Sequence, residues 1–325
     1  MANFHSGGQK YPALWPEERA DGAAKRILRH LLETLEYNQA ELLSGRDGES
    51  LHDFRVAVRR TRCALGQIKQ VFPAPRIRRF AAGFAELGRM SSAARDWEVY
   101  LQGLDAQAQT VPEPLRAALE PLRAELSRRH RRELRHLLRH LRSADHRRFL
   151  AEWRAFLDAP LPRRSSLLHA TQPVLVVAGG RIEKVYRRVL KEGEAIEPDS
   201  PPQALHELRK TCKKLRYLLE FFQALYPPRR LQRLVGILKA LQEELGAYQD
   251  SQVQVAALLE LAATHKLRRA QPMTLMAMGA LLRDVDQRAG QARAGFDRRF
   301  ALLASAKTRR RFAGLLQVDN AAETD

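Results

Sequence analysis

The sequence repeats itself 154 positions later, and this repeat constrains the fold more than any other feature. The run Leu51-His52-Asp53-Phe54-Arg55 returns as Leu205-His206-Glu207-Leu208-Arg209. The same shift relates Arg59 to Lys213, Arg60 to Lys214, Arg62 to Arg216, Phe72-Pro73 to Tyr226-Pro227, Asp96 to Asp250 and Val99 to Val253. A chance match would not hold its register over so many residues. The chain is therefore predicted to be a duplication, with a boundary near Leu161-Pro162.

Each half is predicted to be helical, because Leu, Ala, Arg, Glu and Gln dominate and no segment alternates with the period of a strand. The predicted helices span residues 16–43, 50–72, 76–90, 93–107, 113–142, 146–157, 174–192, 202–226, 228–246, 250–265 and 272–306. Ser50 is expected to cap the second of these, with Asp53 as its capping-box partner. Short turns favour antiparallel bundles. We therefore predict an N-terminal tail (1–15), two bundles (16–160 and 161–306) related by a pseudo-twofold axis, and a C-terminal tail (307–325).

The charge of the chain points to an anionic partner. Fifty-six Lys and Arg residues oppose 37 Asp and Glu residues, which gives a net charge of +19. Such a chain attracts nucleic acid, an anionic membrane surface or polyphosphate. The two cysteines, Cys63 and Cys212, cannot build a disulfide framework, and a cytoplasmic location is expected. No signal peptide is recognised, and the longest apolar run, Val174–Ala178, is too short to cross a bilayer, so no membrane insertion is expected.

The repeated helix carries a row of cations on one face. His52, Arg55, Arg59 and Arg62 are spaced by three, four and three residues, and the row is about 15 Å long at about 1.5 Å per residue. The second copy has the same row in His206, Arg209, Lys213 and Arg216. Like charges at this spacing destabilise a helix, and a ligand that is itself a row of anions would offset that cost. The alternative is a solvated basic face that is paired with acids of a neighbouring helix.

Further cations extend the pattern. Lys25, Arg26 and Arg29 lie on the first helix, and Arg181, Lys184 and Arg188 lie on the first helix of the second half. We expect them to line the same groove, with solubilising charge as an equal alternative. The Arg-rich segment 128–142, which includes Arg132 and Arg135, is either a second binding wall or a generic anion-attracting surface.

Catalytic and metal motifs are absent from the sequence. His136 and His140 have the spacing of a helical zinc pair, but no HExxH glutamate accompanies them and Arg135 and Arg139 would repel a dication. No GxSxG motif and no P-loop is present. We therefore expect no enzyme, no metal and no cofactor. Asp96 and Asp250 are interpreted as helix caps or as acids that orient arginines, near helix starts.

The motifs resemble a known family. The pattern L-H-D-F-R-x-x-x-R-R-x-R, its second copy L-H-E-L-R-K-x-x-K-K-L-R-Y, Arg95-Asp96 and Leu245-Gly246-x-x-Gln249-Asp250 resemble the CHAD domain, the conserved histidine α-helical domain. The resemblance implies two four-helix-bundle repeats around a basic groove, inorganic polyphosphate as the ligand, and a location on polyphosphate granules. Ser91 to Ala94 depart from the family, which more usually has a Leu-Gly pair before Arg95-Asp96. The E-x-E-x-K strand of an attached triphosphate-tunnel domain does not occur.

The combined interpretation is an all-α protein that binds inorganic polyphosphate without catalysis. The alternatives are a nucleic-acid-binding protein with non-specific contacts, a metal-dependent phosphate-processing enzyme and a structural granule adaptor. Monomer and homodimer both stay open. The predicted polyphosphate-binding residues are Arg26, Arg29, His52, Arg55, Arg59, Arg60, Arg62, Lys69, Arg132, Arg135, Arg181, Lys184, Arg188, His206, Arg209, Lys213, Lys214 and Arg216.

Overall fold

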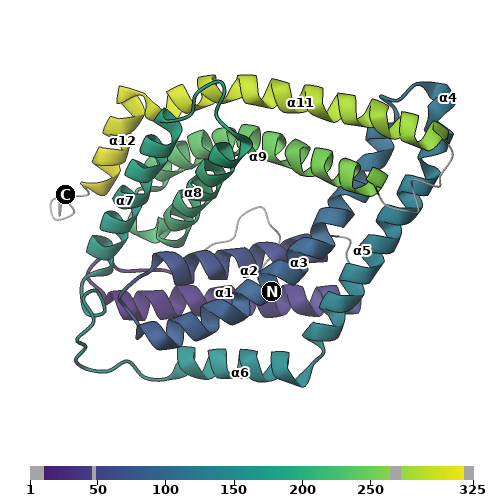
Figure 1. The fold of residues 1–325 in the computed structure, drawn as a ribbon. Coiled ribbons are helices and arrows are strands. Elements are labelled where there is room, and N and C mark those ends of the chain that lie inside the picture. The colour runs from purple at the N-terminus through teal and green to yellow at the C-terminus, as the bar shows by residue number, and fades with distance from the viewer. Residues whose placement is uncertain (1–10, 46–48, 264–271, 318–325) are drawn as a thin grey trace.

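A computed structural model describes residues 11–45, 49–263 and 272–317. Over these ranges the chain is all-α, as predicted, with one isolated backbone bridge between Arg19 and Pro173 (Figure 1). The first half contains α1 (Ala20–Ser44), α2 (Ser50–Gln67), α3 (Ala74–Ala108), α4 (Glu113–Arg116), the 3-10 turn η1 (Ala117–Leu119), α5 (Glu120–Leu141) and α6 (Ala144–Asp158). The second half contains α7 (Val174–Glu194), α8 (Pro202–Phe221), the 3-10 turn η2 (Gln223–Leu225), α9 (Pro228–Ala263), α11 (Pro272–Ala304) and α12 (Ala306–Leu316).

The helix ends follow local rules in most places. Gly45 ends α1 with φ 66°, a left-handed conformation that glycine adopts without strain. Ser143 and Ser305 cap α6 and α12 by accepting hydrogen bonds from the backbone N–H groups of His146 and Thr308. The predicted Ser50 cap is wrong: Ser50 is the first residue of α2, and the preceding Glu49 makes no capping hydrogen bond with its side chain.

Two predicted helix breaks are also wrong. α3 and α9 are single helices of 35 and 36 residues, where the sequence analysis expected an interruption in each. No proline lies at either point, and the Ser91 hydroxyl, which could have favoured a turn, donates to the Leu87 carbonyl of the same helix at 2.8 Å. Asp96 and Asp250 consequently lie inside these long helices and not near their starts.

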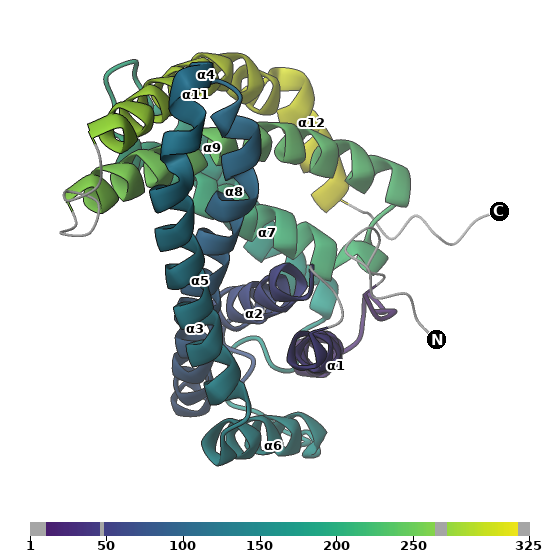
Figure 2. The ribbon, with the colours of Figure 1, turned by 90° about the vertical axis from the view of Figure 1, so that its right-hand side faces the viewer.

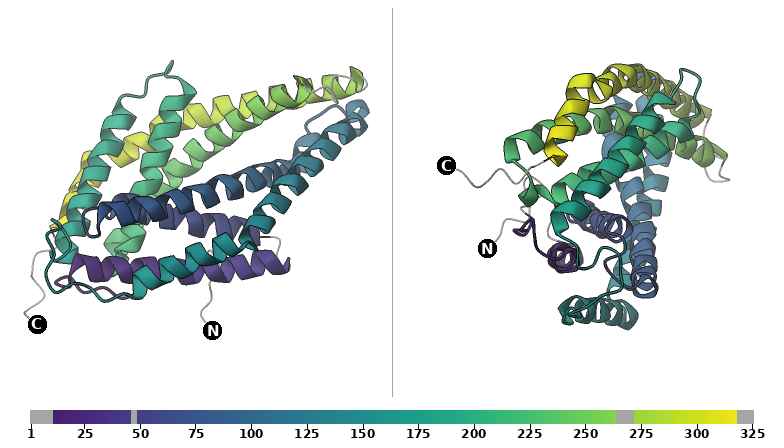
Figure 3. Two further views of the ribbon diagram at one scale, coloured as in Figure 1. Left: turned by 60° about the horizontal axis from the view of Figure 1, so that its bottom comes forward. Right: turned by 90° about the vertical axis from the view of Figure 1, so that its left-hand side faces the viewer.

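The helices enclose two apolar cores. The larger one involves α1, α2, α7, α8 and the near ends of the two long hairpins, with Phe54 and Leu208 fully buried in it. The smaller one lies where the α3/α5 hairpin meets the α9/α11 hairpin at the far end, with Leu122 and Leu281 at its centre. Figures 2 and 3 show α3 beside α5 and the two hairpins converging at that end. The chain therefore closes into a ring, joined once at α2 and α8 and once at the hairpin ends.

The helix order repeats along the chain, since α1, α2, α3, α5 and α6 are followed by α7, α8, α9, α11 and α12 with the same neighbours. The four-helix count and the pseudo-twofold axis stay predictions. The predicted tails differ from the structure, because Tyr11 and Leu14 are buried and α12 buries Phe312 and Leu315 in the larger core. Residues 1–10 and 318–325 lie outside the described residues.

Candidate functional site: a central cluster of cations

The two cationic rows meet where α2 contacts α8. Arg59 Nε on α2 donates to the Tyr217 hydroxyl on α8 at 2.6 Å, and the Arg59 guanidinium lies 5.8 Å from the centre of that ring. One turn earlier on the same face of α2, Arg55 Nε donates to Ser92 Oγ on α3 at 3.2 Å. These contacts hold Arg55 and Arg59 in place before any ligand arrives.

Each half uses one carboxylate to orient an arginine. Asp96 of α3 lies 3.9 Å from Arg55 Nη2, and Asp250 of α9 lies 3.5 Å from Arg209 Nη2. This confirms the interpretation of both aspartates as acids that orient arginines. Burial raises the pKa of Asp96, as does the nearby charge of Asp250, while Arg55 and Arg209 oppose the shift. The two aspartates are therefore close enough to sense each other across the halves.

Lys213 shows how crowded the positive charge is. Burial is the largest cause that lowers its pKa, and the charges of Arg59, Arg209 and Arg55 lower it further, to about 6. Within the described ranges no carboxylate lies within ion-pairing distance of Lys213 or Arg59. We call Arg55, Arg59, Arg209 and Lys213 the central cluster. It holds more positive charge than its two aspartates balance, so it is poised for an anion.

The two histidines of the repeat lie beside the cluster but differ in their surroundings. His206 Nδ1 lies 2.8 Å from Gln249 Oε1 on α9. The matching neighbour of His52 is Arg95, and burial together with Arg95 lowers the pKa of His52. An anion near His52 would oppose both causes and favour its protonated form.

Three further predicted residues have their contacts outside the central cluster. Arg60 Nη2 donates to Glu220 Oε2 at 3.1 Å, and Arg216 Nε lies 3.4 Å from the other oxygen of that carboxylate. Both guanidinium groups also lie against the Tyr217 ring. Arg62 is exposed and lies along α3, where a Cβ at Gly88 would come 2.6 Å from its Nη1. Arg60 thus joins α2 to α8, and Arg216 is held within α8 by the same carboxylate.

The cations of α1 and α7 do not join the central cluster. Arg26 pairs with Glu18 and lies over the Trp15 ring, and Arg29 pairs with Asp158 at 3.0 Å. The remaining predicted cations line a separate pocket: Lys69, Arg181, Lys184, Arg188 and Lys214. The structure therefore does not bring all of these residues into the single groove that the sequence analysis expected.

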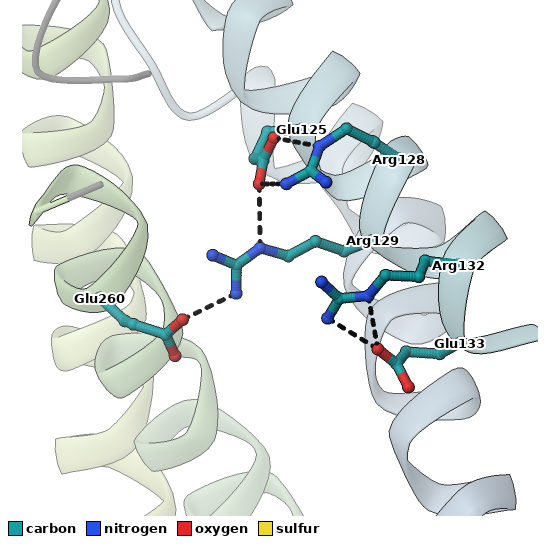
Figure 4. Close-up of polar contacts among 6 residues, drawn as sticks. All are labelled: Glu125, Arg128, Arg129, Arg132, Glu133 and Glu260. Carbon is teal, nitrogen blue, oxygen red and sulfur yellow. Dashed lines mark hydrogen bonds and ion pairs between the residues drawn. The ribbon is translucent and has the colours of Figure 1, made fainter. Parts of the chain in front are cut away.

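Three arginines of the Arg-rich segment of α5, namely Arg128, Arg129 and Arg132, are paired with carboxylates (Figure 4). Glu125 accepts from Arg128 Nε at 2.8 Å and from Arg129 Nε at 3.0 Å, and Arg129 Nη1 reaches Glu260 of α9 at 2.7 Å. Hydrogen bonding from Arg128 lowers the pKa of Glu125 to about 2. Arg132 pairs with its neighbour Glu133, and Arg135 is exposed. Two interpretations of this segment followed from the sequence, a binding wall or an anion-attracting surface. The structure adds a third role, because the ion pair of Arg129 with Glu260 links α5 to α9.

Sequence reasoning missed several partners of the cluster. Tyr217 and Ser92 accept hydrogen bonds from cluster arginines, and Gln249 contacts His206. Glu220 pairs with Arg60 and Arg216. Only Glu220 gave a local signal, as it follows Arg216 by four residues. The others act across helices that the sequence could not place against one another.

In the described part of the chain, no three His, Cys, Asp or Glu side chains gather closely enough to hold a metal ion. Among the described helices, none has the length and apolarity needed to span a bilayer.

The comparisons with known proteins agree with the geometry. The chain is 28% identical over 258 residues to the uncharacterized protein MT2285 of Mycobacterium tuberculosis, covering 76% of this chain and 47% of that protein, so it spans about half of that relative's length. A crystal structure of the CHAD domain from the plant Ricinus communis superposes with a TM-score of 0.74 at 25% identity, covering 91% of this chain and 96% of that one. PptA from Streptomyces chartreusis shares the fold, with a TM-score of 0.69 at 17% identity over 87% of this chain and 99% of that one. Residues 26–259 match the CHAD domain family itself. The chain therefore belongs to the CHAD domain family.

Proposed function

We propose that this chain binds long inorganic polyphosphate, without catalysis, through the central cluster. The observation that carries the proposal is that, within the described ranges, Arg59 and Lys213 have no carboxylate at ion-pairing distance, although Arg55 and Arg209 add further positive charge beside them. A protein keeps such a cluster at a cost in stability, and residues that violate local rules in this way are expected at functional sites. A bound polyanion would remove the cost, since it supplies negative charge to the three arginines and favours the protonated form of Lys213.

The geometry suits a chain of phosphates better than a single ion. The cluster draws cations from both halves, Arg55 and Arg59 from α2 and Arg209 and Lys213 from α8, so it offers a chain of phosphates several points of contact. Guanidinium groups match phosphate oxygens in shape and charge. Release of counterions from polyphosphate would drive association, and binding would strengthen with chain length.

The wider role follows from this chemistry. A protein that holds polyphosphate in a cytoplasm would gather on polyphosphate granules, and the resemblance of the repeated motif to that family supports the same location. The net charge of +19 also attracts nucleic acid non-specifically. Such binding would not depend on the nucleotide sequence, because apart from Tyr217 no aromatic ring contacts the cluster within the described residues to stack on a base.

The test is a calorimetric titration with polyphosphates of several lengths and with single-stranded RNA, at two salt concentrations and at equal phosphate concentration. We expect long polyphosphate to bind most tightly and to displace RNA. The variant R55A/R59A/R209A/K213A should lose binding while its helical circular dichroism is unchanged. The control R76A/R78A/R229A/R233A removes four exposed cations that have no ion pair in the described structure. It should bind nearly as the parent does.

Three results would contradict the proposal. RNA that displaces polyphosphate would favour the nucleic-acid alternative. Release of phosphate by the pure protein in the presence of a divalent metal would identify an enzyme. Equal weakening in the two quadruple variants would mean that overall charge, and not the central cluster, binds the polyanion.

A further inference from the structure

A second cationic site lies on the other side of α8. A pocket of about 770 Å³ is enclosed by α7, α8, the end of α2 and the segment before α7. We call it the α7 pocket. It contains none of the four residues of the central cluster. The neighbours Lys213 and Lys214 lie about 100° apart around α8, so the helix presents Lys213 to the cluster and Lys214 to the α7 pocket.

The lining of the α7 pocket is positive and contains no carboxylate. Its cations are Lys69, Arg181, Lys184, Arg188 and Lys214. Of these, only Arg188 has an ion pair among the described residues, with Glu192 at 2.5 Å. Arg181 donates from Nη2 to Gln67 Oε1 at 2.8 Å, but its Nε is buried and has no hydrogen-bond partner. Burial lowers the pKa of Arg181, which is the signature of a cation without an adjacent anion.

The first half shows what fills the matching place. The shift of 154 residues relates Lys214 to Arg60 and Lys184 to His30. There the N-terminal segment occupies the space: the Tyr11 ring lies 5.3 Å from both the His30 and Phe221 rings, and Glu18 pairs with Arg26. The position is thus filled by an aromatic ring, and Arg60, the counterpart of Lys214, pairs with Glu220.

The second half has neither the aromatic ring of Tyr11 nor the acid Glu18 at the matching positions. The same shift relates Tyr11 to Ser165, Trp15 to His169 and Glu18 to Gln172. Leu14 is 5% exposed, whereas its counterpart Leu168 is 61% exposed. His169 and Gln172 instead line the α7 pocket. The pocket is therefore a position of the repeat that has been opened and left positive.

The rest of the lining indicates an organic ligand. Val176, Val177 and Val185 form an apolar wall, and the side-chain amides of Gln67, Gln70 and Gln172 add donors and acceptors. The volume falls within the range of about 300–1,000 Å³ typical of small-molecule sites. An inorganic oligophosphate would use only the cations.

We propose that the α7 pocket binds a nucleotide-sized organic polyphosphate. Arg181, Lys184 and Lys214 hold its phosphate groups, and the valines and glutamine amides hold its organic part. This site is independent of the polyphosphate-binding function proposed for the central cluster.

The test is calorimetric titration of the full chain with ATP, GTP, tripolyphosphate and adenosine, without added metal. The variant K184A/K214A should weaken binding of at least one nucleotide by about tenfold or more, because it removes two charge-assisted contacts. The control K191A/K239A removes two exposed lysines outside the pocket and should leave nucleotide binding unchanged. The variant R55A/K213A should lose long-chain polyphosphate binding and keep nucleotide binding, so failure of either proposal is seen separately.

A second measurement does not depend on variants. Acetylation of lysines followed by mass spectrometry should show that the nucleotide protects Lys69, Lys184 and Lys214 but not Lys191. The proposal is overturned if neither nucleotide binds, if tripolyphosphate binds as tightly as both nucleotides, or if R55A/K213A and not K184A/K214A removes nucleotide binding. Protection of Lys213 in place of Lys214 would overturn it as well.

Discussion

The central cluster and the Arg-rich segment of α5 look alike in sequence and differ in their surroundings. On α5, Arg128 and Arg129 share the buried Glu125, Arg129 also pairs with the exposed Glu260 of α9, and Arg132 pairs with Glu133. In the central cluster four cations share two aspartates that are themselves more than half exposed. A cationic run therefore says little until its partners are known. What distinguishes a binding site is positive charge that is partly buried and poorly compensated.

The largest expected effect separates the two regions directly. The variant R55A/R59A/R209A/K213A should weaken binding of long polyphosphate by more than about 100-fold, since several charge-assisted contacts are lost. The variant R131A/R135A/R139A/R142A removes the same number of charges from exposed positions on α5 and should weaken it by less than about tenfold. Titration at several salt concentrations also gives the slope of the logarithm of affinity against the logarithm of salt concentration. This slope should become shallower only for the first variant. A similar loss in both would restore α5 as a second binding wall.

The contrast between these regions marks what the sequence could and could not predict. The all-α fold followed from composition and helical spacing, and the repeated cationic rows predicted that Arg55 and Arg209 would lie in one site, where both act on Lys213. The sequence did not reveal that Arg60 and Arg216 close on Glu220, because the Arg60 partner lies 160 residues away on another helix. The same limit hid the partition of Lys213 and Lys214 between two sites, which depends on where α7 packs.

The next effect is a dependence of affinity on pH. In the ligand-free protein the pKa of Lys213 is about 6. Phosphate oxygens beside Lys213 would raise that pKa, so the protein takes up a proton when it binds the anion above about pH 6. Affinity should therefore fall as pH rises from 7 to 9, by at most about tenfold per pH unit. K213R keeps its charge over this range, and its affinity should be nearly flat.

His52 also lies beside the cluster. Burial and Arg95 lower its pKa, and an anion would oppose that shift, so the comparison with K213R isolates the contribution of Lys213. Titrations in two buffers of different ionisation enthalpy would count the protons taken up. An affinity of the parent protein that does not change between pH 7 and 9 would show that Lys213 does not face the anion.

A smaller effect tests the structural role given to α5. Arg129→Ala removes the link from α5 to Glu260 of α9 and one of the two partners of Glu125, whose side chain is only 6% exposed. We expect a loss of about 1–3 kcal/mol in unfolding free energy, or about 2–4 °C in Tm for each kcal/mol, with unchanged polyphosphate binding. Arg132→Ala, three residues on, breaks only a pair between sequence neighbours and should change Tm by less than 1 °C, or about 0.5 kcal/mol at most. Equal Tm values for the two variants would remove the argument for a tie between the halves.

The smallest effect has the opposite sign and belongs to the central cluster. Because folding lowers the Lys213 pKa from 10.5 to about 6, the unfolded chain holds one proton more than the folded chain between those pH values. The stability cost of Lys213 is therefore complete below about pH 6 and disappears as pH rises through the unfolded value. K213Q should raise Tm by about 2–4 °C at pH 7 and by progressively less toward pH 10, measured by calorimetry without ligand. The matched change K191Q, at an exposed lysine of α7, should leave Tm unchanged. A K213Q protein that is less stable than the parent at pH 7 would mean that Lys213 is compensated within the folded chain, and the cluster would then have no excess charge to offer an anion.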